Sequence, residues 1–359
     1  MIALVTDEAT GAETALGCAL RPEDKPYGCA LTGSQGTGKC IGPEDLVLLE
    51  GRLVRAADAW DEYATSAIFD GEGWWSEPLR WPLTCALDDR GRIVQAPVRR
   101  LYRQRVREHG RRVTLSDGSQ LTVTDRHRLR GPDDWVATAE EGDTVCVPRR
   151  LEWPGRRLPE ELVELLAWQL TEGCERSGGR RAPTAGTVSI TQADRRVVER
   201  ARLLAERVGE LYGLRMNAMP VRRTKTCWTL FIHSAEWRDF LMCRGYRWGA
   251  ASAGKRLPDF LMQGDVDSSR LFLRVFFAAE GHVNASHLTL EAASASRLLL
   301  EQVRTLLRRF GILARLEPKP ARATNGRSIV RPYYRLRLAG PSLRTFLAEI
   351  GIAAPEKEA

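Results

Sequence analysis

The sequence predicts a multi-domain α+β protein, in which an all-β unit over residues 40–155 precedes a two-repeat α+β domain over residues 156–353. In the first region, short runs of strand-forming residues alternate with turn pairs such as Glu50-Gly51 and Asp117-Gly118. From about residue 158 the apolar spacing becomes helical, and one order of helices and strands then occurs twice. A repeated element order indicates two pseudo-equivalent halves.

Composition limits the classes of protein that need to be considered. The chain has 359 residues, enough for two or three domains, and a net charge of +8, which suits a polyanionic partner but is weak evidence alone. Its eight cysteines include no C-x-x-C pair, so we expect neither a zinc site nor a disulfide framework, and a cytoplasmic location. A signal segment and long apolar runs are absent from the sequence, so we expect no membrane association.

Residues 1–39 form a short N-terminal stub that ends in an interrupted phosphate-binding loop. Residues 33–40, GSQGTGKC, follow the pattern G-x-x-x-x-G-K-[ST] except at the last position. That position needs a hydroxyl because Mg²⁺ prefers hard oxygen ligands, whereas Cys40 supplies a soft thiol. A working ATPase is therefore disfavoured, and the stub is too small to fold as one.

Residues 40–155 contain the strand signals of the all-β unit. We expect strands at residues 46–49, 113–115 and 121–124, each followed or preceded by a turn. Pro154-Gly155 then marks a linker to the next domain.

Two blocks in this unit resemble those of inteins. Cys40 with residues 41–54 resembles the opening block, in which a cysteine precedes a strand, a turn and a second strand. Residues 121–127, LTVTDRH, resemble the second block with its T-x-x-H motif, and residues 135–145 resemble the strand that follows it. The order and separation of the two blocks make the pair more specific than its residue types, because a single T-x-x-H motif is usually accidental.

The resemblance implies a Hint-like splicing module with an autocatalytic step. Cys40 would attack the Lys39 carbonyl to form a thioester, His127 would protonate the leaving nitrogen, and Thr124 would hydrogen-bond the scissile peptide. Because inteins insert at functional sites of their hosts, excision would join Lys39 to a new residue. A Thr or Ser there would complete the loop of a P-loop ATPase, which would then be the host, or extein.

In residues 156–353 the expected elements follow one another twice. Leu162, Leu165, Leu166 and Leu170 are spaced for one helix face, and strands are expected at residues 187–190 and 228–232. The second half repeats this order, with helices expected near 269–279 and 296–310 and strands at 288–290 and 334–338.

Each half opens with a segment that resembles the LAGLIDADG motif of homing endonucleases. These segments are residues 165–173, LLAWQLTEG, and residues 271–281, LFLRVFFAAEG. Each is an apolar helix that ends in a carboxylate and a glycine, and we expect that glycine to adopt the left-handed C-cap conformation. Residues 254–260 resemble the K-x-x-P block between the copies, and residues 293–297, 306–312, 334–338 and 346–352 resemble the closing pattern.

This resemblance implies a two-repeat αββαββα endonuclease that cuts double-stranded DNA with Mg²⁺, as a monomer. Glu172 and Glu280 would bind the metal at the ends of paired helices, and Lys255 would stabilise charge at the scissile phosphate. The strands would read the major groove. The basic residues expected to contact DNA are Arg180, Arg181, Arg222, Arg223, Lys225, Arg322, Arg327, Arg331, Arg335 and Arg337.

The resemblance also implies a closing splicing block with a His-Asn pair, which residues 354–359, a short tail, do not contain. We therefore expect that this chain does not complete splicing alone. Three explanations are open: half of a split intein with a separately encoded C-terminal fragment, a truncated gene product, or a decayed splicing module beside a working endonuclease. An inert relic that binds DNA without cutting is the remaining alternative.

Overall fold

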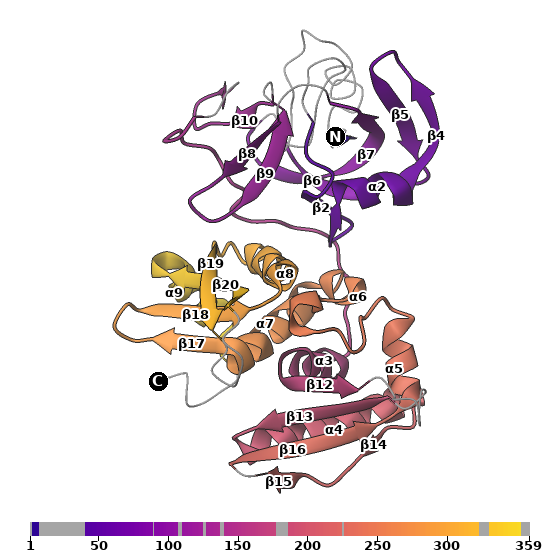
Figure 1. The fold of residues 1–359 in the computed structure, drawn as a ribbon, viewed down its shortest axis with the longest axis vertical. Helices are drawn as coiled ribbons and strands as arrows, with labels where there is room; N and C mark the ends of the chain where they lie inside the picture. Colours follow the sequence, from indigo (N-terminus) through magenta and orange to yellow (C-terminus); the bar gives the residue numbers. More distant parts are fainter. Residues whose placement is uncertain are drawn as a thin grey trace. The chain divides into compact units, whose positions relative to one another are not determined.

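The computed structural model describes residues 2–6, 40–88, 90–106, 110–124, 127–136, 140–176, 186–224, 226–322 and 330–352. The chain divides into two compact units, Met1–Pro154 and Gly155–Ala359 (Figure 1). The division falls between Pro154 and Gly155, which is one residue before the start of the second domain expected at residue 156.

The N-terminal unit is built around one long strand, β7, which is paired along both edges. Its main sheet has the order β1-β7-β5-β4, and β6 pairs with the first part of β7; β2–β3, β8–β9 and β10–β11 are hairpins. The elements of this unit are β1 (Ile2–Thr6), β2 (Leu46–Leu49), β3 (Arg52–Arg55), α2 (Ala56–Tyr63), β4 (Ala64–Phe69), β5 (Gly73–Pro78), β6 (Leu83–Leu87), β7 (Ile93–Gln104), β8 (Gly110–Thr114), β9 (Gln120–Thr124), β10 (Leu129–Arg130) and β11 (Trp135–Val136).

Two features of this unit correct the sequence-based expectation. The unit is not all-β, because α2 buries Ala56, Ala59, Trp60 and Tyr63, which recur at the i, i+3, i+4, i+7 spacing of one helix face. In addition, β1 belongs to the expected N-terminal stub, yet it pairs antiparallel with residues 98–103 of β7. The stub therefore contributes a strand to the main sheet of this unit.

The predicted strands at residues 46–49 and 121–124 are confirmed as β2 and β9. The β8–β9 turn contains Gly118 at φ 82°, a left-handed conformation that favours glycine, as the Asp117-Gly118 pair predicts. Ile41, Val47, Leu49 and Val123 are buried in one cluster with α2 and β7 residues. The start of the expected splicing module is thus packed into the core of the unit.

The C-terminal unit contains the predicted element order twice. The first half comprises α3 (Glu160–Glu172), β12 (Gly173–Arg176), β13 (Thr187–Gln192), α4 (Arg195–Tyr212), β14 (Asn217–Ala218), β15 (Arg222–Thr224), β16 (Cys227–His233) and α5 (Ala235–Met242). The second half comprises α7 (Val266–Glu280), β17 (Gly281–Asn284), β18 (Thr289–Ser294), α8 (Arg297–Arg308), β19 (Arg315–Arg322), β20 (Val330–Ala339) and α9 (Gly340–Glu349). A short helical turn η1 (Ser252–Gly254) and α6 (Asp259–Met262) connect them.

Each half is an antiparallel sheet with helices packed on one face. The first sheet has the order β12-β13-β16-β14 with β15 also beside β16, and the second has the order β17-β18-β20-β19. Val188, Ile190, Leu230 and Ile232 are buried on the face of the first sheet that α4 covers. Because side chains alternate along a strand, the residues between them lie on the opposite, uncovered face.

The motif helices α3 and α7 pack against each other, and each runs directly into a strand (Figure 1). The glycines after them do not adopt the expected left-handed conformation: Gly173 has φ −79° and Gly281 has φ −75°. Glycine is needed for space instead. A Cβ at Gly173 would lie 2.1 Å from the Gln169 carbonyl oxygen, and one at Gly281 would lie 2.1 Å from that of Phe277.

None of the helices in the described ranges combines the length and the apolar character needed to cross a bilayer.

Candidate functional site

The first candidate site is the segment from Cys40 to Gly42, which lies antiparallel to the end of β9. Ile41 and Val123 form the bridge, Gly42 N–H donates to the Thr122 carbonyl at 2.7 Å, and Thr124 N–H donates to the Cys40 carbonyl at 3.3 Å. The Cys40 side chain is 2% exposed. Backbone pairing therefore brings residue 40 beside residue 124, although 84 positions separate them in the chain.

This pairing places Cys40 beside Thr124, two of the three residues expected to take part in acyl transfer, and the third, His127, follows Thr124 by three positions. The Cys40 N–H points at the Thr124 hydroxyl oxygen at 3.5 Å, a long contact for a hydrogen bond. His127 N–H donates to the Thr124 carbonyl at 2.9 Å, and the side chains of Thr124 and His127 are both buried. The carbonyl of Lys39, which Cys40 would attack, lies outside the described residues.

Two aromatic side chains that the sequence analysis did not single out, Tyr102 and Trp75, pack beside Cys40. Cys40 packs against Tyr102, whose ring lies 4.5 Å from the ring of Trp75, and the Trp75 indole N–H donates to Asp70 at 2.7 Å. Burial raises the pKa of Tyr102, and the negative charge of Asp70 raises it further. Tyr102 lies so close to Gly73 that a Cβ there would meet its hydroxyl oxygen at 2.6 Å.

The second candidate site lies where α3 and α7 end in Glu172 and Glu280. The two helices pack against each other, so the repeated motif brings its two carboxylates to the ends of paired helices, as the sequence analysis expected. Glu280 is exposed and Glu172 is partly exposed, so both carboxylates have access to solvent.

Gln192 at the end of β13 is a residue that the sequence analysis missed. Its side-chain amide donates to Glu172 Oε1 at 2.7 Å. The registers Gly173↔Ile190 and Gly281↔Ala292 make Ser294 its counterpart in the second half. Ser294 Oγ accepts from the Ser296 N–H at 3.1 Å, so the two halves carry different residue types at this position. Gln192 and Ser294 each lie two positions after the residue that pairs with the motif glycine, Ile190 or Ala292. A comparison of the two halves at this position is the signal that identifies Gln192.

The Lys255 side chain lies at the end of α3, where its ammonium group is bound by the helix backbone. Its ammonium donates to the Leu170 carbonyl at 2.7 Å, and its own carbonyl accepts from the Ser296 hydroxyl at 2.6 Å. A cation at the carboxyl end of a helix is stabilised by the helix dipole. Lys255 therefore connects α3 to the start of α8 next to Glu172.

On the first sheet, the pleat separates the two predicted arginines of β15. Arg223 is opposite Trp228 and its guanidinium lies 6.0 Å from that ring, which Arg195 of α4 also covers at 4.9 Å. Arg222 is opposite Thr229 on the uncovered face, where Thr229 bonds to Thr191 at 3.0 Å. Arg222 and Arg223 thus lie on opposite faces. The predicted residues Arg180, Arg181 and Lys225 lie outside the described residues.

On the second sheet, the uncovered face carries arginines that are paired with glutamates. Arg335 donates to Glu317 at 2.8 Å and to Glu291 at 3.2 Å, and Arg337 lies 3.4 Å from Glu291. These pairs hold both guanidinium groups in place on one face. Arg327 and the side chains of Arg322 and Arg331 lie outside what the structure describes.

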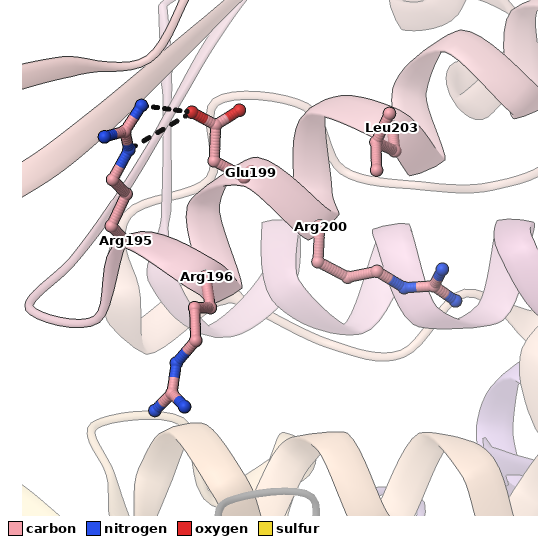
Figure 2. Close-up of a pocket in the computed structure, with 5 residues that line it drawn as sticks. All are labelled: Arg195, Arg196, Glu199, Arg200 and Leu203. Atoms are coloured by element: carbon pink, nitrogen blue, oxygen red, sulfur yellow. Dashed lines mark hydrogen bonds and ion pairs between the residues drawn. The ribbon is translucent and has the colours of Figure 1, made fainter.

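A shallow pocket on α4 is lined by Arg195, Arg196, Glu199, Arg200 and Leu203 (Figure 2). Its three cations are all engaged: Arg195 with Glu199 at 3.2 Å, Arg196 with Asp194 and Arg200 with Glu164. A single helix supplies the whole lining, on the side of the sheet away from the uncovered face. We assign this pocket no function.

The donors at the helix ends fit a divalent cation. Carboxylate oxygens are the hard ligands that Mg²⁺ prefers, and Mg²⁺ binds through one or two of them while keeping other ligands from water or phosphate. In the described part of the chain, no three His, Cys, Asp or Glu side chains form a metal-binding cluster.

Comparison with protein families identifies part of this unit. Residues 267–351 match the model of the LAGLIDADG-like domain. The match covers α7 and the second sheet, and the expectation of a LAGLIDADG-type enzyme is supported for this half. The half before it has the same element order apart from one extra strand, β15, with α3 in the place of α7.

Curated relatives align with most of the chain. A replication factor C small subunit from Methanocaldococcus jannaschii is 24% identical over 91% of this chain and 17% of its own length. A protein of the same name from Thermococcus kodakarensis is 25% identical over 91% of this chain and 35% of its own length. One subunit of the A-type ATP synthase of Pyrococcus abyssi is 24% identical over 89% of this chain and 32% of its own length. The chain thus spans about a third or less of each of these relatives.

Among solved structures, variants of the homing endonuclease I-DmoI align with 54% of this chain and 95% of their own, at 14% identity and a TM-score of 0.41.

Proposed function

We propose that the C-terminal unit is a site-specific endonuclease that cuts double-stranded DNA with a divalent cation, Mg²⁺ in the first place. The observation that carries the proposal is the repeated motif. The helices α3 and α7 pack together, and each ends in a glutamate followed by a glycine at a position with no room for a Cβ. The match of residues 267–351 to the LAGLIDADG-like domain supports it. Because one chain supplies both motif helices, we propose that it acts as a monomer.

Glu172 and Glu280 would hold the cation next to the scissile phosphates. A bound cation supplies a polarised water and neutralises charge on the phosphate. Gln192 orients the Glu172 carboxylate through its amide, and Lys255 adds positive charge beside the same helix end. The protein thereby fixes the Glu172 carboxylate before DNA arrives.

The uncovered faces of the two sheets would bind the DNA. Arg222 in the first half and Arg335 and Arg337 in the second lie on these faces, and affinity carried by such residues falls as salt rises. For Arg335 and Arg337, binding to phosphate requires an exchange of Glu291 and Glu317 for the ligand. Because the glutamates compete with phosphate for these arginines, a DNA must make further contacts besides its phosphate charge in order to bind. Such a requirement favours sequence-specific binding.

The test uses a pool of supercoiled plasmids with random inserts, incubated with the full chain and MgCl₂. We expect a subset of inserts to be enriched in linear product, and Glu172→Gln or Glu280→Gln to abolish cleavage while DNA binding remains. Glu349→Gln is the matched control because Glu349 also ends a helix, α9, outside the motif. No linear product at any concentration of Mg²⁺ or Mn²⁺, or full activity in both motif variants, contradicts the proposal.

We propose as a second function that the N-terminal unit carries out the first step of protein splicing at Cys40. Two observations support it. Backbone pairing places Cys40 beside Thr124, and the His127 N–H donates to the Thr124 carbonyl. The relatives that align with about nine-tenths of this chain have names with unrelated activities, replication and ATP synthesis, and the aligned segment is a minor part of each. An insertion shared by different hosts explains that pattern, and those hosts fit an extein that ends in a P-loop.

In this step the Cys40 sulfur attacks the Lys39 carbonyl carbon, the bond from that carbon to the Cys40 nitrogen breaks, and the thiol proton is transferred to the nitrogen. The products are a thioester and a free amine. Thr124 lies against the departing nitrogen, and His127 would relay the thiol proton to that nitrogen, so that sulfur loses one proton and nitrogen gains one.

The test incubates the full chain with dithiothreitol at neutral pH and follows the release of residues 1–39 by mass spectrometry. We expect release from the wild type and none from Cys40→Ala, with slower release from His127→Ala. Cys85→Ala is the control, since Cys85 is also buried in this unit. The absence of release from the wild type, both alone and mixed with a C-terminal splicing fragment, contradicts this second function.

A further inference from the structure

Asp45 connects the segment that begins with Cys40 to the strand that ends with Thr124. One of its carboxylate oxygens, Oδ2, accepts from the Gly42 N–H at 2.7 Å and from the Thr122 N–H at 2.9 Å. Gly42 is two residues after Cys40, and Thr122 is two residues before Thr124. The two bonds therefore link the two sides of the candidate acyl-transfer site.

The bond to Thr122 distinguishes Asp45 from an ordinary turn residue. An aspartate that stabilises only its own turn accepts from N–H groups one to three residues away, and the bond to Gly42 is of that kind. Thr122 is 77 positions away in the chain. A single oxygen thus carries a local bond and a long-range bond.

The surroundings of Asp45 leave little freedom for another arrangement. Gly42 approaches β9 so closely that a Cβ on it would lie 2.9 Å from Thr122 Cβ and 3.0 Å from Asp45 Oδ2. The Asp45 backbone is held as well, because its carbonyl accepts from the Ala56 N–H at the start of α2 at 2.9 Å. The backbone of Asp45 is therefore fixed by the start of α2, and its carboxylate holds Thr122 of β9.

Burial of the Asp45 carboxylate makes its charged form less favourable. Burial raises the pKa of Asp45, while its bonds from Thr122 and Gly42 and the charge of Arg112 on β8 lower it in part. The neighbouring charges Glu44 and Arg55 pair with each other at 3.0 Å. The Asp45 carboxylate is thus partly buried and accepts from two backbone donors at one oxygen.

We infer that Asp45 is a positioning residue, which holds Cys40 in register with Thr124 so that the thiol and the departing nitrogen are correctly placed for acyl transfer. This inference rests on the second proposed function. It assigns the residue to no chemical step: Asp45 acts on the reacting atoms through the backbone of Gly42 and Thr122.

The test measures the rate of dithiothreitol-induced release of residues 1–39 and the rate at which iodoacetamide alkylates Cys40, both in the full chain. We expect Asp45→Ala to slow release by about 10- to 100-fold, the usual effect of misplacing a reacting group, and to speed alkylation of the buried thiol. Asp45→Asn keeps one acceptor oxygen and is expected to recover most of both effects. Gly42→Ala, which displaces the same contact from the other side, is expected to resemble Asp45→Ala.

The matched control is Asp88→Ala. Asp88 lies in the same unit and also accepts from two backbone N–H groups, those of Arg90 and Arg92, but within its own turn. Because the neutral amide does not titrate, the ratio of wild-type to Asp45→Asn release rates should be constant near neutral pH and should change as acid protonates Asp45. A general loss of stability would not tie the change in this ratio to the protonation of Asp45.

The outcomes separate the two proposals. Release and alkylation rates in Asp45→Ala equal to those of the wild type and of Asp88→Ala overturn the inference. If no variant releases residues 1–39 but Asp45→Ala still exposes Cys40 to alkylation, Asp45 holds the register and the acyl-transfer function is refuted. Slower release together with faster alkylation supports both.

Discussion

Replacing Gly173 or Gly281 by alanine tests how the motif helices hold their carboxylates. Each added Cβ would lie 2.1 Å from the carbonyl oxygen four residues earlier, whereas real Cβ contacts are essentially never under 3.0 Å. The helix end must therefore open by roughly 1 Å. Because the obstacle is backbone rather than a flexible side chain, no rotamer change relieves it.

The expected cost follows from this displacement. Forcing backbone shifts in a packed core costs about 2–3 kcal/mol, which corresponds to a fall of roughly 5–10 °C in the melting temperature of a unit of this size. The shift also moves the residue before the glycine, so Glu172 or Glu280 leaves its place. We expect DNA cleavage to be lost in both variants at temperatures where they remain folded.

The assay is differential scanning calorimetry on the full chain, followed by cleavage of a selected plasmid target. Gly254→Ala is the control because it lies in the same unit, and its Cβ would meet Ala250 Cβ at 3.8 Å, an ordinary contact. Melting temperatures of Gly173→Ala and Gly281→Ala within 1–2 °C (about 0.5 kcal/mol) of this control would refute the steric reasoning.

Three further predictions follow from single contacts. Gln192→Ala removes the amide that holds Glu172 but leaves Glu280 unaffected, so one strand should be cut about tenfold more slowly and nicked plasmid should accumulate, as seen by gel electrophoresis; equal slowing of both strands contradicts it. Arg222→Ala should weaken DNA binding and reduce the slope of log K against log salt by about one, whereas Arg223→Ala, on the opposite face, should leave that slope unchanged in filter-binding titrations. Asp265→Ala should destabilise the C-terminal unit by about 1 kcal/mol at pH 7, because Asp265 caps α7 by accepting from Ser268 at 2.8 Å. Burial raises the pKa of Asp265, but the bonds from Ser268 and the charges of Arg157 and Arg309 together outweigh burial and lower it below 3.8. The difference from the wild type in urea unfolding should therefore be constant above that pH and disappear as pH falls through the lowered value.

The local pattern of this sequence determined the elements and their repetition. Apolar residues at helical spacing predict α3 and α7, alternating residues predict β9, and the Asp117-Gly118 pair predicts its turn, because these signals depend on a few neighbouring residues. The same local reading failed for α2, whose eight residues follow directly from a strand and are too few to stand out. It also assigned a left-handed role to Gly173 and Gly281, since a steric requirement for glycine looks the same in a sequence as a conformational one.

The tertiary structure alone decided which distant residues meet. Asp45 reaches Thr122, Gln192 reaches Glu172, and Lys255 reaches the Leu170 carbonyl, each through a register or a packing that no local signal specifies. It also decided which basic residues share a face, because the pleat sends Arg222 and Arg223 to opposite sides of the sheet. The hypotheses for the chemistry of the motifs came from residue types. Their positioning depends on long-range backbone pairing, which forms only when the whole chain has folded.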